Sequence, residues 1–195
     1  GGQSSARNRG AAVASGSHLS FIDQDDVWFA DKLEIVVPHL ADGVGTVYTD
    51  ADTIDEHGST VLRGIHRNHG CGAPHPKRGV EDILFKDVFV MPGVMTVRKK
   101  VFDAVGGFDE ALSGYEDDDL FLRLFAGSSV VYLPASTLKW RMYLGNYSQS
   151  DRMIRSRLAY WRKLMLQWAA DGGDRRLALG ISWRFYREFL RQAAQ

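Results

Sequence analysis

The stretch Leu19-Ser20-Phe21-Ile22-Asp23-Gln24-Asp25-Asp26 decides the fold class of this chain. A short, largely apolar run changes abruptly into a carboxylate-rich segment, which is typical of a buried strand that ends in a polar loop. Ligands of open α/β sheets bind beyond the carboxyl ends of the strands. The stretch therefore predicts a sheet strand that delivers acidic side chains to a candidate site.

Patterns of strands and helices alternate along the residues that follow. Strand patterns lie at residues 45–49, 88–90, 94–97 and 130–134, and helical patterns at residues 31–40, 99–105 and 120–125. This order predicts an α/β fold with a mostly parallel sheet flanked by helices. Residues 52–80 contain Gly, His, Pro and Asn with weak periodicity, and we interpret them as a long excursion or flexible loop.

Residues 151–195 differ from residues 1–150 in pattern and charge. Large apolar side chains recur there at helical spacing, at Ile154, Leu158, Trp161, Met165 and Trp168. A second amphipathic helix carries Trp183, Tyr186 and Leu190. The region has ten basic and four acidic residues, whereas the preceding 150 residues have 14 basic and 20 acidic ones. We divide the chain into an α/β domain (1–150) and a helical C-terminal extension (151–195), and expect different partners for the two.

The composition excludes several classes of protein. The formal net charge of the 195 residues is zero, so nothing in the global charge points to a nucleic-acid partner. The single cysteine, Cys71, cannot form an internal disulfide framework. The sequence contains no apolar run near the roughly 20 residues that span a bilayer. These observations make a reducing, cytoplasmic setting the default expectation.

Three carboxylates follow the first predicted strand. Asp23, Asp25 and Asp26 are hard oxygen ligands, and two or three such groups can hold Mg²⁺ or Mn²⁺ while phosphate oxygens complete the shell. The alternative is a solvated acidic loop ahead of the helix that begins near Asp31. The acidic pattern alone favours the solvated loop. With an apolar strand before it, the metal site and the solvated loop are about equally well supported.

A second acidic run, Glu116-Asp117-Asp118-Asp119, opens a predicted helix. Neighbouring carboxylates raise one another's pKa, which suits a general base. The alternative is that these acids only stabilise the first turn of the helix, where negative charge is favoured. On composition alone the second interpretation is preferred.

A helical pattern of small residues begins after an N-cap at Ser4 or Ser5 and ends near Gly16, and Arg7 and Asn8 lie near its start. Helix N-termini bind phosphate readily, so both residues are candidates for substrate binding. The alternative is an ordinary surface helix.

Taken together and in order, these segments resemble the family 2 glycosyltransferases, which have the GT-A fold. Residues 2–10 look like the family's Ala-Arg-Asn helix, and residues 21–28 look like its D-x-D segment. Residues 47–50 match the next strand, and residues 105–110 and 114–120 match the acceptor-side G-G-F-D-E and E-D motifs. Each motif is weak alone, but five in the right order and spacing are a strong signal. The resemblance covers residues 1–150.

The resemblance implies roles for individual residues. Asp23, Asp25 and Asp26 would bind the Mg²⁺ or Mn²⁺ ion that bridges the diphosphate of a nucleotide sugar. Asp117 would be the base that deprotonates the acceptor hydroxyl, and Glu116 would hold acceptor or donor sugar. The remaining substrate-binding positions implied are Arg7, Asn8, Asp23, Gly106, Gly107 and Arg141.

The same resemblance implies the reaction and its partners. The enzyme would transfer a sugar from a nucleotide-diphosphate sugar to the hydroxyl of a glycan or a lipid-linked acceptor, with inversion at the anomeric carbon. Polysaccharide or glycan synthesis at the cell surface would be its setting.

The chain departs from the family pattern in two places. The family begins with a strand and helix upstream of the Ala-Arg-Asn segment, and this sequence opens at that segment. It therefore looks like a fragment that lacks the first βα units, and we expect it to bind the donor poorly. Many relatives also have a His shortly after the position of Arg141, where this chain has Tyr143.

Two other functions remain open at the level of sequence. Phe21 to Val27 also fits the D-x-D-x-[T/V] pattern of a haloacid dehalogenase-like phosphatase, with Asp23 as nucleophile and Thr49 in its second motif. A carbohydrate-binding domain without catalysis is the non-enzymatic alternative.

The C-terminal extension likewise has two interpretations. Its apolar stripe packs on the catalytic domain in the preferred one. In the other, its Trp and basic residues rest on anionic lipid, which would make the protein peripheral to the cytoplasmic face of the membrane.

Overall fold

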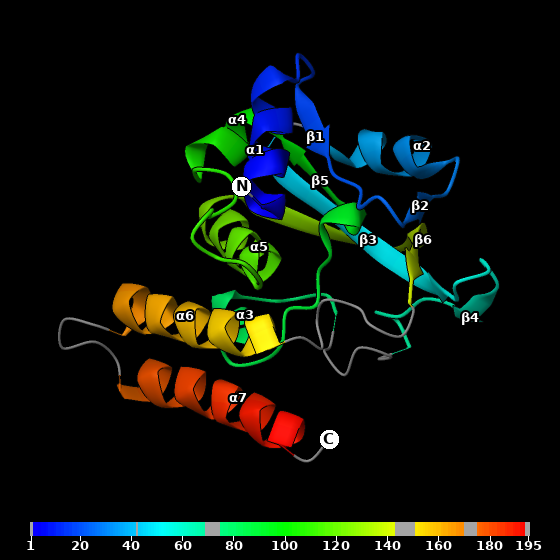
Figure 1. The fold of residues 1–195 in the computed structure, drawn as a ribbon. Coiled ribbons are helices and arrows are strands. Elements are labelled where there is room, and N and C mark those ends of the chain that lie inside the picture. Colours follow the sequence, from blue (N-terminus) through cyan, green and yellow to red (C-terminus); the bar gives the residue numbers. More distant parts are fainter. Residues whose placement is uncertain (1, 42, 69–74, 143–150, 170–174, 194–195) are drawn as a thin grey trace.

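A computed structural model describes residues 2–41, 43–68, 75–142, 151–169 and 175–193, and Figure 1 shows their arrangement. The strands are β1 (His18–Ser20), β2 (Val27–Trp28), β3 (Val44–Ile54), β4 (Thr60–Leu62), β5 (Met95–Arg98) and β6 (Ser129–Arg141). The α-helices are α1 (Gln3–Val13), α2 (Lys32–Val36), α3 (Val80–Leu84), α4 (Lys99–Ala104), α5 (Glu116–Gly127), α6 (Asp151–Trp168) and α7 (Arg175–Ala193). Short 3₁₀ helices, η1 (Val37–His39) and η2 (Pro92–Val94), follow α2 and precede β5. The predicted α/β class is confirmed.

The sheet is mixed, so the prediction of a mostly parallel sheet was wrong. Its strand order is β1-β5-β3-β6-β2, and β4 pairs with the end of β3. Among the strand pairs of the described residues, only β3 and β6 run parallel. The alternation of strand and helix patterns does not fix which strands become neighbours, and β5 inserts antiparallel between β1 and β3. Helix α5 precedes β6 and packs against it.

The long strands β3 and β6 are neighbours in the middle of the sheet. β3 is buried along nearly its whole length, and Tyr48 and Ala51 belong to the core that also contains Leu120 and Phe121 of α5. The parallel pairing of β3 and β6 carries register shifts on both sides of Asp50, so the two strands bend there. Beyond this bend β6 pairs with β2, which follows the loop that carries the first acidic segment.

The segment after β3 is more ordered than a flexible loop. β3 continues to Ile54 and returns through β4, and the side chains of His66 and Lys77 are buried. The ring of His66 lies between the carbonyl oxygens of Thr49 and Phe89, at 3.1 and 2.9 Å. Of the two interpretations of this segment, the flexible loop therefore fails for residues 52–68 and 75–80, whereas the long excursion agrees with the position of β4 off the main strand order.

Helices α6 and α7 pack side by side, and α5 lies between them and the sheet (Figure 1). Tyr160 and Leu164 of α6 and Ile181 and Phe185 of α7 are buried in the main core. Packing of the extension on the domain is thus confirmed. The predicted stripe is correct in part: Trp161, Met165 and Trp168 are partly buried against the core, whereas Ile154 and Leu158 are each 39% exposed. Within the described ranges, no helix has the length and hydropathy to cross a membrane.

Candidate active site

One arginine joins the two acidic segments. Arg7 Nη2 lies 2.5 Å from Asp23 Oδ1, and Arg7 Nη1 lies 3.1 Å from Glu116 Oε1. The Arg7 side chain is only 11% exposed. Carboxylates that are more than 90 residues apart in the sequence therefore meet across a single guanidinium group. The structure thus brings one carboxylate of each acidic segment to a shared cation.

Helix α5 presents a row of four acids, and three of them have their own cation. Glu116 pairs with Arg7, as described. Asp118 pairs with Arg184 of α7 at 2.7 Å. Asp119 pairs with Arg123 at 2.6 Å and with Lys163 of α6 at 2.7 Å.

Asp117 is different from the other members of the row. Its Oδ1 accepts a hydrogen bond from the backbone N–H of Asp118 at 2.9 Å, and no described residue forms a salt bridge with it. Burial and, after it, the negative charge of Glu116 raise the pKa of Asp117 to about 7, although Arg7 acts in the opposite direction. A carboxyl that titrates near neutrality is suited to accept a proton.

Arg141 fastens the D-x-D-D loop to the sheet. Its backbone N–H donates to Asp26 Oδ1 at 3.0 Å, and its Nε donates to the carbonyl oxygen of Asp25 at 2.9 Å. Its Nη1 donates to the carbonyl oxygens of Asp55 and Glu56, which follow β3. These contacts give Arg141, predicted to bind substrate, a role in holding the loop. Tyr143 lies outside the described residues.

The three carboxylates of the loop lie close to one another. Burial, together with the charges of Asp23 and Asp25, raises the pKa of Asp26 to about 6, and the hydrogen bond from Arg141 opposes this shift. No group of three or more His, Cys, Asp or Glu side chains in the described ranges is arranged as a metal site. The loop nevertheless offers hard oxygen donors, which fit a Mg²⁺ or Mn²⁺ ion whose remaining ligands come from phosphates and water.

Asn8 and the glycine pair lock α1 to the segment after α4. Asn8 Nδ2 donates to the Phe108 carbonyl oxygen at 2.9 Å, and Phe108 N–H donates to Asn8 Oδ1 at 2.9 Å. Gly107 has a φ of 65°, and a Cβ there would lie 2.8 Å from Asn8 Oδ1. A side chain at Gly107 would therefore disrupt this contact. Gly106 and Gly107 also line a cavity of about 330 Å³, whose charged lining residues are Asp109, Glu110, Arg123 and Lys163.

Two functional candidates were missed at the level of sequence. Arg184 is 1% exposed and donates to Asp118, to the Ile83 carbonyl oxygen and to Glu188. Burial lowers the pKa of Arg184, but the negative charges of Asp118 and Glu188 outweigh this and raise it, so the side chain stays charged. The second candidate is Lys163, which forms salt bridges with Asp109 and Asp119. The excess of acids in residues 1–150 and of bases in residues 151–195 was the signal that could have found both, because the two regions neutralise each other here.

Thr49 rules out the pairing that a dehalogenase-like site would need. Its side chain is fully buried, and its hydroxyl is 2.6 Å from the Thr137 hydroxyl and 3.4 Å from the Val94 carbonyl oxygen. It is therefore not available to a phosphoryl group held by Asp23.

Comparison with known proteins gives one consistent result. The sequence model of Glycosyl transferase family 2 matches residues 1–106. The chain is 29% identical over 128 residues to the O-antigen biosynthesis protein RfbC of Myxococcus xanthus. This match covers 65% of this chain and 9% of that protein. It is 27% identical over 127 residues to an uncharacterized glycosyltransferase of Haemophilus influenzae. That match covers 63% of this chain and 40% of that protein. The chain thus spans well under two thirds of these relatives.

Solved structures of low sequence identity share the fold. TarS 1–349 of S. aureus superposes with a TM-score of 0.61 at 14% identity, over 97% of this chain and 52% of that one. The mannosyltransferase PcManGT of Pyrobaculum calidifontis, in complex with GDP-Man and Mn²⁺, gives a TM-score of 0.59 at 17% identity, over 94% and 49% of the two chains. Both neighbours are GT-A glycosyltransferases, which confirms the predicted fold.

Proposed function

Because the chain belongs to Glycosyl transferase family 2, we propose that it carries the catalytic site of an inverting, metal-dependent transferase. This enzyme would move a sugar from a nucleotide-diphosphate sugar to an acceptor hydroxyl. The observation that carries the proposal is the isolation of Asp117, which lacks a salt bridge among the described residues although its three neighbours in the row each have one. Cations neutralise Glu116, Asp118 and Asp119, which leaves Asp117 as the carboxylate of the row that can accept a proton. A general base has to accept a proton from the substrate.

Asp117 would take the proton of the acceptor hydroxyl as that oxygen attacks the anomeric carbon. The bond between the anomeric carbon and the diphosphate oxygen breaks as the new glycosidic bond forms, so the configuration inverts. The two ion pairs of Arg7 would hold the Glu116 and Asp23 carboxylates in position during this step. Most of the remaining rate gain would come from holding donor and acceptor in line.

The D-x-D-D loop would face the diphosphate of the donor. Asp25 and Asp26, with Asp23, would hold a divalent cation there, and that ion supplies charge neutralisation for the leaving diphosphate when it is bound. Support comes from the oxygen donors of the loop and from a structural neighbour that was solved with GDP-Man and Mn²⁺. The Myxococcus relative is named for O-antigen biosynthesis, which supports a role in cell-surface polysaccharide synthesis. The acceptor would then be a glycan or a lipid-linked acceptor.

Replacement of Asp25 by Asn should weaken Mn²⁺ binding. Loss of a group that only supports a metal ligand already costs about 10–100-fold in affinity, and loss of a ligand should cost at least as much. The measurement is the enhancement of water proton relaxation during a Mn²⁺ titration in the presence of a nucleoside diphosphate. Asp31→Asn is the matched control, because Asp31 is exposed, forms no side-chain cap bond with α2 and carries the same charge. Equal Mn²⁺ affinity in both variants would remove Asp25 from the site.

The transfer rate should rise with pH and level off above about 7. Asp117 accepts a proton only when it is ionised, and burial beside Glu116 raises its pKa to about 7. Below that value the rate should fall about tenfold per pH unit. The measurement is the rate of nucleoside diphosphate release at saturating donor and acceptor between pH 5 and pH 9. A rate that stays constant from pH 5 to pH 8 would contradict a base with this pKa.

A further inference from the structure

The outer face of α7 is an exposed apolar stripe. Leu179, Trp183, Tyr186 and Leu190 follow one another at spacings of four, three and four residues, which places them on one face of the helix. They are 71%, 58%, 52% and 51% exposed. The rings of Trp183 and Tyr186 are stacked, with centroids 5.6 Å apart. A contiguous apolar surface of this kind marks an interaction site.

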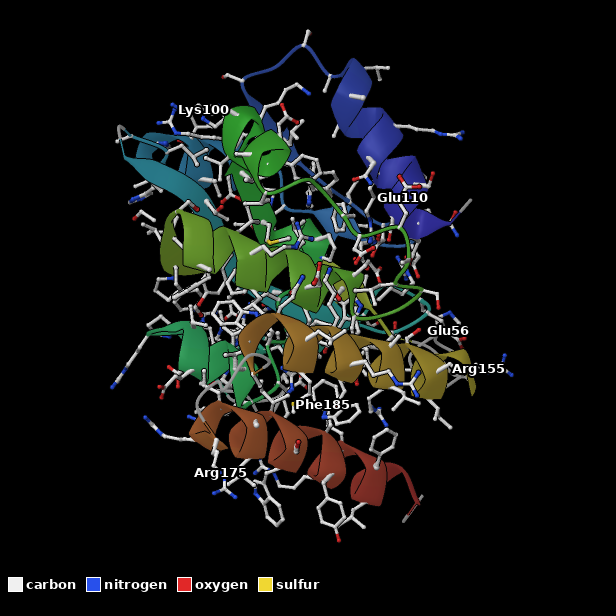
Figure 2. The ribbon with its side chains drawn as sticks, turned by 90° about the vertical axis from the view of Figure 1, so that its left-hand side faces the viewer. Glu56, Lys100, Glu110, Arg155, Arg175 and Phe185 are labelled. Carbon is white, nitrogen blue, oxygen red and sulfur yellow. The ribbon has the colours of Figure 1, made fainter. Side chains whose placement is uncertain are left out.

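The stripe is exposed although α7 is well packed against the protein through its opposite face. The opposite face of α7 already supplies the core with Ile181, Arg184 and Phe185, all of them buried. Figure 2 shows Phe185 in the layer between α6 and α7. The helix therefore has two apolar faces, and only one of them is needed for the fold.

The exposed charged side chains described on α7 are all basic. Arg175, Arg176 and Arg187 are exposed on α7, and Arg155 and Arg162 are exposed on α6. Figure 2 shows Arg155 and Arg175 at the periphery of the helix pair. Glu188 is half-buried and is turned inward to Arg157 and Arg184, so the described side chains of α7 include no exposed acid.

Docking of the extension does not use all of its positive charge. Arg157, Lys163 and Arg184 form buried or half-buried salt bridges with acids. Arg176 pairs with Glu81 of α3, but both partners stay exposed. Arg175 and Arg187 thus remain at the surface of the helix that carries the apolar stripe.

We propose that the outer face of α7 rests on an anionic lipid surface. Leucine side chains would enter the acyl boundary, while Trp and Tyr occupy the headgroup level, where their amphipathic rings are favoured. The arginines would pair with the acidic headgroups, each contributing about fivefold in binding. Self-association through this face is disfavoured, because a two-fold contact brings the arginines of two copies together.

The test is co-sedimentation of the full chain with vesicles of phosphatidylcholine, with and without 30% phosphatidylglycerol. Wild type should bind the anionic vesicles, bind pure phosphatidylcholine weakly, and lose affinity as salt is raised. Trp183→Ser with Tyr186→Ser should weaken binding about tenfold or more. Arg175→Gln with Arg187→Gln should weaken it about 25-fold, from about fivefold per arginine. The control is Val13→Ser with Val61→Ser, which removes two apolar side chains as exposed as the stripe but on α1 and β4.

A second measurement reports insertion directly. Brominated phosphatidylcholine in the anionic vesicles should quench a part of the tryptophan fluorescence that disappears in Trp183→Phe. All substituted residues are exposed, so unchanged far-UV circular dichroism is expected for each variant. The proposal is overturned if wild type does not bind anionic vesicles, if the stripe variant binds as well as the control, or if the stripe instead supports a concentration-dependent dimer in sedimentation velocity.

Discussion

Replacement of Asp117 by Asn should reduce sugar transfer by about 10²–10⁴-fold, the usual contribution of a positioned general base. The amide keeps the size of the side chain and can still accept the hydrogen bond from the Asp118 N–H. It cannot take the proton of the acceptor hydroxyl. The loss should therefore appear in the rate of nucleoside diphosphate release at saturating substrates, while donor affinity measured by calorimetry stays near that of wild type.

The stability of the same variant separates catalysis from folding. The pKa of Asp117 is raised from 3.8 to about 7 in the folded protein, so its burial lowers stability progressively between about pH 4 and pH 7, and the full cost is present above pH 7. Asn removes this cost, and the midpoint of thermal unfolding at pH 8 should not fall below that of wild type. Asp103→Asn, an exposed acid on α4, should change neither the rate nor the midpoint. A large loss of donor affinity in Asp117→Asn would make Asp117 a binding residue rather than a base.

The acidic segments show what sequence can predict about a site. Each follows a local rule, because a strand end or a helix start places the carboxylates at a defined edge of an element. The family resemblance assigns both segments to one reaction, and the structure brings one carboxylate of each to Arg7. The residue that joins them, Arg7, was expected to bind phosphate, since nothing in its local sequence indicates two carboxylate partners.

The errors in the fold have a common cause. Periodicity indicates that residues 94–97 form a strand, but it does not indicate that β5 runs antiparallel between β1 and β3. It likewise indicates that α6 is amphipathic without fixing which face is buried, because large apolar side chains surround much of the helix. Tyr160 and Leu164 are buried there, whereas Ile154 and Leu158 are half-exposed. Partner choice and helix rotation depend on tertiary contacts, which a single sequence does not show.

The charge asymmetry of the chain was interpreted too narrowly. Opposite net charges in residues 1–150 and 151–195 suggested that the two regions bind different partners. Arg184 and Lys163 instead bind acids of α5, so a part of that asymmetry is satisfied within the molecule. Exposed arginines of α6 and α7, among them Arg155 and Arg175, stay available to an external partner.

Replacement of Arg184 by Met should destabilise the protein by about 3–5 kcal/mol, because it leaves the buried Asp118 carboxylate without its cation. Met fills a similar volume and keeps an apolar stem against Tyr160 and Phe185, which the guanidinium now contacts. The measurement is the free energy of unfolding in urea at pH 8. Arg187→Met is the matched control, since Arg187 lies on the same helix, is exposed and should cost less than about 0.5 kcal/mol.

The double variant Arg184→Met with Asp118→Asn decides whether the loss comes from the unpaired charge. When both charges are absent, no buried ion remains to be solvated, and most of the lost stability should return. The transfer rate of the double variant then tests the link to the base, because Asp118 donates the backbone N–H that holds Asp117. Stability that stays low would assign the role of Arg184 to its bond with the Ile83 carbonyl oxygen instead. Recovery of stability with a reduced rate would show that the C-terminal helix pair positions the base.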